Sequence, residues 1–142
     1  MAATGLDVID RSLHVTHVWL DEIMEALGPD RQFAWHVLGG VLRCLRDRLT
    51  PELAAHLGAL LPLIVRGAYY DRYQPSKMPE KIRSLDDFLE KLGDHLSWTR
   101  PVNAQDAVQA VCRVLDKHLE PNQAEKVWEA LPEEIRRVAR PG

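Results

Sequence analysis

Cysteine is scarce in this chain of 142 residues: only Cys44 and Cys112 are present, and they lie far apart. Neither has a second cysteine nearby, so the CxxC spacing of redox centres and zinc sites is absent. Each cysteine lies in an apolar helical pattern, which is typical of a small buried side chain.

The motifs of the common catalytic and nucleotide-binding loops are also missing. The chain contains no GxSxG nucleophile motif, no GxxxxGKS or GxxxxGKT phosphate loop, no GxGxxG turn and no EF-hand loop. His14, His17 and Asp21 have a spacing that suits metal ligands on one helix face, but no HExxH or second Glu-x-x-His element accompanies them. We therefore expect no catalytic residue, no metal site and no cofactor.

Neither a long apolar run nor an excess of one charge is present. The longest strongly apolar stretch, Leu57 to Val65, is too short to span a bilayer and contains Pro62. The N-terminal residues show no signal-peptide pattern, so we expect a cytoplasmic protein. The net charge of −3 lacks the basic excess of nucleic-acid-binding and membrane-surface proteins, and we expect neither of these partners.

Helical periodicity is the dominant pattern that the chain does have. Apolar residues recur at helical spacing along almost the whole sequence, without an alternating strand pattern. This predicts a single all-α domain over residues 1–142, built from six or seven helices. Asp30, Thr50 and Ser84 stand at expected helix starts, and Pro62 should kink or interrupt the third helix.

Residues 33–67 resemble the residues that lie 70 positions further on. Ten of these 35 positions are identical, where about two would be expected by chance. The identities include Pro51 with Pro121 and Pro62 with Pro132, and amphipathic helices alone would not place both prolines in register. We predict an internal duplication with one shared core. Its parts are two three-helix units, residues 6–67 and 84–138, and a connector, residues 68–83.

The connector and the helix end before it gather all three tyrosines of the chain. The segment from Arg72 to Arg83 has a net charge of +3, the most basic window in the sequence. Asp71 should lie near a helix C-terminus, where the helix dipole disfavours a carboxylate, so it needs a cation such as Arg66 or Arg72. The candidate binding residues are Arg66, Tyr69, Tyr70, Asp71, Tyr73, Lys81 and Arg83.

The same segment carries a family resemblance. Its pattern is Leu61-Pro62, Arg66-Gly67, Tyr69-Tyr70, Asp71, Pro75 and Lys81. This pattern resembles that of a bacterial all-helical family known as a domain of unknown function (number twenty-two sixty-seven). The resemblance covers nearly the whole chain and implies a helical fold with the duplication. It implies no activity.

Three interpretations of the connector stay open. The tyrosines cover the junction between the two units and have no other role. Alternatively, the connector of a non-enzymatic adaptor contacts a protein partner or a second copy, since aromatic and Arg residues are enriched at interfaces; this is the function we expect. It requires Arg66, Tyr69, Tyr70 and Asp71 to be partly exposed. The third interpretation is a site, conceivably enzymatic, for an anionic small molecule between the units. It requires a cleft lined by Arg66 and a tyrosine, with Lys81 or Arg83 within reach.

Overall fold

In a computed structural model, residues 4–141 form eight α-helices and one short 3-10 turn, and this part of the chain contains no strand. The all-α prediction is confirmed, whereas the predicted count of six or seven helices is too low. The elements are α1 (Asp7–Leu27), α2 (Arg31–Arg48), α3 (Pro51–Leu60), α4 (Leu63–Tyr70), the 3-10 turn η1 (Pro75–Lys77), α5 (Leu85–His95), α6 (Ala104–His118), α7 (Pro121–Ala130) and α8 (Glu133–Ala139).

Two Leu-Pro pairs account for the additional helix. Leu61 follows α3 and Leu131 follows α7, and both are extended, with ψ angles of 147° and 146°. A following proline disfavours the helical conformation of the residue before it, so each helix ends there. A new helix begins directly after each proline. The last segment is therefore a separate helix, α8.

Four helices begin at a polar side chain that accepts a hydrogen bond from the backbone N–H three residues on. These side chains are Asp30 before α2, Thr50 before α3, Ser84 before α5 and Asn103 before α6. Pro51 occupies the first position of α3, where a helix needs no N–H donor. The helix starts expected at Asp30, Thr50 and Ser84 agree with the structure.

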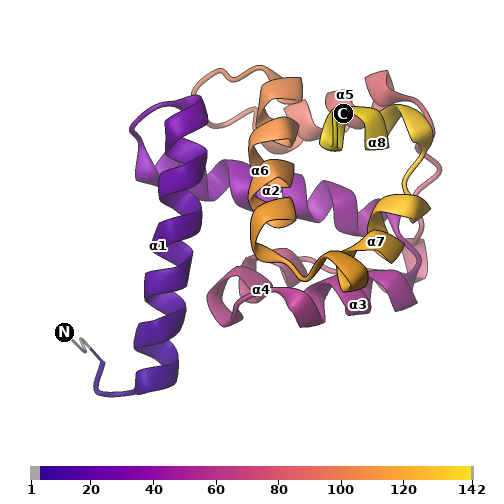
Figure 1. Cartoon of the computed structure of the whole chain (residues 1–142). Helices are drawn as coiled ribbons and strands as arrows, with labels where there is room; N and C mark the ends of the chain where they lie inside the picture. The colour runs from indigo at the N-terminus through magenta and orange to yellow at the C-terminus, as the bar shows by residue number, and fades with distance from the viewer. Residues whose placement is uncertain (1–3, 142) are drawn as a thin grey trace.

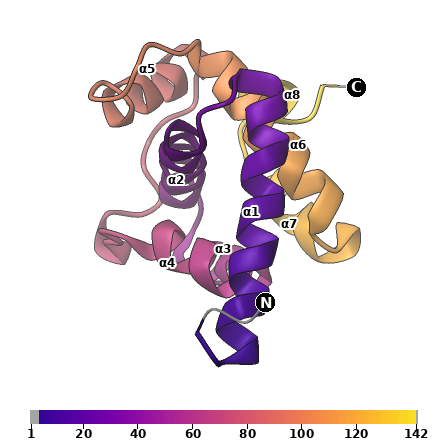
Figure 2. The same ribbon diagram turned by 90° about the vertical axis from the view of Figure 1, so that its left-hand side faces the viewer.

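The helix α2 runs through the middle of the molecule (Figures 1 and 2). In Figure 1, α3 and α4 lie below it and α5 and α8 lie above it. Every residue of α2 from Val37 to Arg46 is buried except Arg43, so this helix is enclosed on nearly all sides. A helix buried all round must be apolar almost throughout, and two arginines near its end are exceptions that need an explanation.

Helices at corresponding positions in the two halves of the chain make corresponding contacts. α1 packs against α2, α4 and α6, while α5 packs against α6, α8 and α2. The central helices α2 and α6 contact each other, and so do α3 and α7. Each half thus contains four helices rather than the three we expected, because Leu-Pro splits the last one. This arrangement is compatible with a duplication, which stays a prediction from the sequence.

The connector is shifted relative to its predicted bounds of 68–83. Because α4 continues through Tyr70, the segment between the last helix of the first half and α5 is residues 71–84. Its backbone contacts α2 through the N–H of Glu80, which donates to the carbonyl of Asp47 at 2.8 Å. Arg48 also donates from Nε to the carbonyl of Ile82. The connector is therefore held against α2 along its length.

Both cysteines are buried and unpaired, as the sequence predicted. Burial raises the pKa of the Cys44 thiol to about 12 and also raises the pKa of Cys112. Across residues 4–141, no helix has both the length and the apolar character that crossing a membrane requires.

Gly58 allows a close approach between α3 and α4. A Cβ atom at this position would lie 2.7 Å from Cζ and 2.8 Å from Cε2 of Tyr70, distances that real side chains do not tolerate. The Tyr70 ring is held edge-to-face between the rings of Tyr69 and Tyr73, at centroid distances of 5.0 and 5.3 Å. It cannot move aside without disturbing both neighbours.

We predict that Gly58→Ala destabilises the protein. The expected loss is about 1–3 kcal/mol, the usual range for inserting atoms into a packed core. Urea unfolding followed by circular dichroism would measure it. Gly67→Ala in α4 is the matched control, because a Cβ there would meet no atom within 4 Å. The better helix propensity of alanine should leave that variant as stable as the wild type or slightly more stable. Equal effects of the two substitutions would contradict the close approach.

Candidate functional site

Tyr69 is a core residue rather than a surface residue. Its exposed fraction is 0%, and its hydroxyl donates to the carbonyl of Ala54 at 2.6 Å. Burial raises the pKa of Tyr69 above its ordinary value. The expectation that this side chain is partly exposed is wrong, because α4 folds back so that Tyr69 points at α3. Its role in the structure is to join the two helices.

Arg66 stabilises the end of α3. Its guanidinium donates from Nε to the carbonyl of Gly58 at 2.9 Å and from Nη2 to that of Leu61 at 2.8 Å. The last carbonyls of a helix lack partners within the helix and carry partial negative charge, so a cation there is favourable. Seventy residues on, Arg136 reaches the carbonyl of Glu129 at the end of α7. The Nε and Nη2 donors of Arg66 are thus used in hydrogen bonds to backbone carbonyls.

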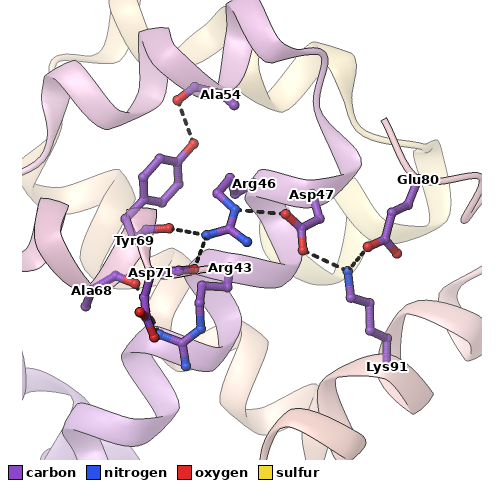
Figure 3. A network of polar contacts seen from close by, with 9 residues as sticks. All are labelled: Arg43, Arg46, Asp47, Ala54, Ala68, Tyr69, Asp71, Glu80 and Lys91. Atoms are coloured by element: carbon purple, nitrogen blue, oxygen red, sulfur yellow. Dashed lines mark hydrogen bonds and ion pairs between the residues drawn. The ribbon is translucent and has the colours of Figure 1, made fainter. Parts of the chain in front are cut away.

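Arg46 is the residue that organises the end of α4 (Figure 3). It is only 2% exposed, although it carries a full charge. Its Nη1 donates to the carbonyls of Tyr69 and Asp71, at 2.6 and 2.7 Å, and its Nε donates to a carboxylate oxygen of Asp47 at 2.8 Å. Its guanidinium carbon also lies 5.3 Å from the centre of the Tyr73 ring. These partners offset the cost of removing the charge from water.

The ion pair of Arg46 and Asp47 continues across the molecule. Lys91 on α5 donates to the second carboxylate oxygen of Asp47 at 3.1 Å and also contacts the carboxylate of Glu80 in the connector. Burial alone would lower the pKa of Lys91, but the carboxylates of Glu80 and Asp47 outweigh it and raise the pKa. Lys91 is therefore charged at neutral pH. This chain of alternating charges ties α2, the connector and α5 together.

A cleft of about 550 Å³ opens beside this network. It lies between α2, the end of α4 and the end of α5. Its polar lining contains three arginines, three aspartates and one histidine, and Trp98 stands at its edge. The lining residues are Arg43, Arg46, Asp47, Asp71, Arg72, Asp94, His95 and Trp98.

The cations of the cleft differ in how they are held. Arg43 donates from Nη1 to the carbonyl of Ala68 at 3.1 Å, and burial lowers its pKa while Asp71 opposes that shift. It stays protonated at neutral pH, as arginine does in proteins. Burial lowers the pKa of His95 as well, with Lys91 and Arg43 contributing, so its ring is neutral at pH 7. The cationic groups of the cleft are thus its three arginines, and its three aspartates carry an equal number of negative charges.

Arg72 has a left-handed backbone, with φ of 56°. This conformation costs roughly 1–2 kcal/mol for a residue with a Cβ atom, and glycine usually occupies it just after a helix. Arg72 is exposed at the rim of the cleft. A strained position that carries a charged side chain beside a cleft favours a functional role for that side chain.

The cleft contains only one of the seven predicted binding residues, Asp71. Tyr70 and Tyr73 are half-buried, and Lys81 and Arg83 are exposed on the connector, outside the lining. Sequence analysis did not propose Arg43 and Arg46 as site residues. A signal exists for Arg43, which interrupts an otherwise apolar run from Val37 to Leu45, and Arg46 follows this run directly. Trp98, in the loop between α5 and α6, gave no such signal.

We predict that Arg46→Met strongly destabilises the protein. It removes the donor from one of the two carboxylate oxygens of Asp47 and from the carbonyls of Tyr69 and Asp71. Breaking a buried pair from one side costs about 3–5 kcal/mol. Equilibrium unfolding in urea would measure the loss. Arg43→Met is the control, since Arg43 is half-buried and donates to a single carbonyl, and it should cost about 1 kcal/mol. A cost below 1 kcal/mol for Arg46→Met would show that the network is not structural.

Comparison with known proteins identifies the family of the chain, but the description of that family names no activity. The chain matches the model of a family described as "Uncharacterized conserved protein (DUF2267)" over residues 16–138. This range begins within α1 and ends within α8, so it includes every residue that lines the cleft. No curated protein matches the chain.

Proposed function

Because the chain belongs to the family of uncharacterized conserved proteins DUF2267, whose description names no activity, we propose a function from the cleft: binding of a small anionic molecule between α2, the end of α4 and the end of α5. The observation that carries the proposal is the guanidinium of Arg46. This side chain is 2% exposed, and its Nε and Nη1 donate hydrogen bonds to other groups of the protein. Arg46 is nevertheless one of the residues that line the cleft.

Arg46 presents its remaining donors in a fixed orientation. Across residues 4–141, Nη2 makes no hydrogen bond, and Figure 3 shows this atom without a partner. A guanidinium already held on two sides loses little freedom when it binds a ligand, so its hydrogen bonds contribute more to affinity. Arg43 and Arg72 add two further guanidinium groups, whose paired N–H donors suit phosphate or carboxylate oxygens.

The aspartates of the cleft restrict which anions fit. Asp47 is paired with Arg46 and Lys91 and does not repel a ligand as a free carboxylate would. Asp71 and Asp94 are exposed, and their side chains are acceptors for hydroxyl or amino groups. The arrangement binds an anionic group through the arginines and leaves two carboxylates for hydrogen-bond donors of the same ligand.

The shape supports this proposal over the protein-interaction module that we expected from the sequence. That interpretation needed Arg66, Tyr69, Tyr70 and Asp71 to be partly exposed. Tyr69 is buried, whereas Arg66 and Tyr70 are half-buried and Asp71 is exposed. The ligand interpretation needed a cleft lined by Arg66 and a tyrosine, with Lys81 or Arg83 within reach. A cleft is present, but none of these residues lines it; its cations are Arg43, Arg46 and Arg72, and its aromatic residue is Trp98.

We expect that loss of the Arg43 or the Arg72 guanidinium weakens anion binding by about tenfold or more. A hydrogen bond to a charged group contributes about 1.5–3 kcal/mol, and 1.4 kcal/mol is a factor of ten in affinity. Isothermal titration calorimetry of the full chain with inorganic phosphate, pyrophosphate and citrate would compare the wild type with Arg43→Gln and Arg72→Gly. The variant Arg113→Gln is the control. Arg113 lies 70 residues after Arg43 and is exposed on α6 outside the cleft, so its loss should leave binding unchanged.

Arg72→Gly also separates function from stability. Glycine adopts the left-handed conformation without strain, so the melting temperature should stay equal or rise slightly while binding falls. A purely structural role for Arg72 would instead lower the melting temperature. If none of the three anions binds the wild type at millimolar concentration, or if Arg113→Gln weakens binding as much as Arg43→Gln, the proposed function is wrong.

A further inference from the structure

Trp98 is an exposed aromatic side chain at the edge of the cleft. Within residues 4–141, five large apolar side chains are exposed, and Trp98 is the most exposed of them at 65%. The other four, Leu6, Val8, Leu13 and Leu63, lie on or beside α1 and α4 and do not line the cleft. An indole that is 65% exposed forgoes much of the apolar burial available to it, which favours a role in binding.

The indole is held in a defined orientation although it is exposed. Its Nε1–H donates to the carbonyl of His95 at 3.1 Å. The ring of His36 on α2 packs against it, with centroids 4.2 Å apart and planes inclined at 71°. In an edge-to-face pair only one face of one ring is covered, so at least one face of the indole is left uncovered by His36. Trp98 is thus a flat platform that a ligand finds already oriented.

Trp98 also forms a wall shared by two hollows. One is the arginine-lined cleft, and the other has a volume of about 180 Å³ and is lined by residues that include Gln32, His36 and Thr99. Small-molecule sites typically enclose about 300–1,000 Å³, so the cleft and the neighbouring hollow together have the size of one such site. An anionic group held by the arginines would have the indole beside it.

We infer that the ligand of this cleft is a nucleoside phosphate. The inference rests on the proposed function, because it assigns the phosphate to Arg43, Arg46 and Arg72. The base stacks on the Trp98 face, where stacking on an aromatic side chain tolerates any base. The sugar hydroxyls and amino groups of the base supply donors for Asp71 and Asp94, which a bare phosphate would leave unused.

The second half of the chain provides an internal comparison. Seventy residues after Arg46 the sequence has Asp116, which is paired with Arg140 at 3.3 Å. The loop after α1 contains Gly28 and Pro29, whereas the loop after α5 contains Trp98. The corresponding surface of the second half thus lacks both the buried guanidinium and the indole. The structure assigns one nucleoside phosphate site to the chain.

Calorimetry of the full chain with a graded set of compounds tests the inference. The set is adenosine monophosphate, uridine monophosphate, ribose 5-phosphate, adenosine and inorganic phosphate. Stacking of a base on an aromatic side chain corresponds to roughly 5- to 150-fold in affinity. Both nucleotides should therefore bind at least about fivefold more tightly than ribose 5-phosphate. Trp98→Phe should preserve this preference, because it keeps a flat ring, and Trp98→Leu should abolish it.

The arginines should act on the other part of the ligand. Arg72→Gly should weaken the nucleotides and ribose 5-phosphate by the same factor and leave the preference for a base unchanged. Because Trp98 is exposed, both Trp98 variants should fold, and a thermal melt without ligand checks this. Equal binding of ribose 5-phosphate and the nucleotides overturns the inference but leaves the proposed function standing. Binding of none of the phosphates overturns both. A preference that survives Trp98→Leu places the base elsewhere and overturns the inference.

Discussion

The buried guanidinium of Arg46 is the interaction on which this end of the molecule depends. A charge that is 98% removed from solvent would be strongly unfavourable alone, and its partners come from three different segments. The carbonyls of Tyr69 and Asp71 close the end of α4, and Asp47 is its neighbour on α2. Through Asp47 the network reaches Lys91 on α5 and Glu80 in the connector. The position of α4 relative to α2 and α5 is therefore fixed by polar contacts as well as by apolar burial.

The same residue explains why a cleft persists where these helices meet. Apolar side chains at this junction would close it, since they gain from excluding water. Charged side chains that need partners keep it hydrated and open. Arg43, Arg72 and Asp94 line it for this reason, and the tyrosines next to it are used for packing. The Arg46 guanidinium thus serves both the fold and the proposed binding. Its Nε and Nη1 donate to the protein, and its Nη2 is available to a ligand.

The sequence predicts the local features of this fold well and the site poorly. Helix starts at Asp30, Thr50 and Ser84 depend on hydrogen bonds to backbone three residues away, so their signal lies in a short window. Pro62 likewise acts on its immediate neighbour. The environment of Arg46 depends instead on carbonyls 23 and 25 residues away, which its own helix cannot reveal. The burial of Tyr69 depends in the same way on how α4 folds back onto α3.

Each half of the chain packs its first helix against the other half, and these contacts affect how the chain folds. α1 lies against α6 of the other half, and α5 lies against α2 of the first, so the halves are interlocked rather than stacked. A fragment that ends in the connector would retain α1 without the surface that α6 provides, and α2 would lose its cover of α5. Neither half encloses its own core. We therefore expect a single cooperative folding transition in which long-range contacts form together, and we expect two separated halves to be stable only in association with each other.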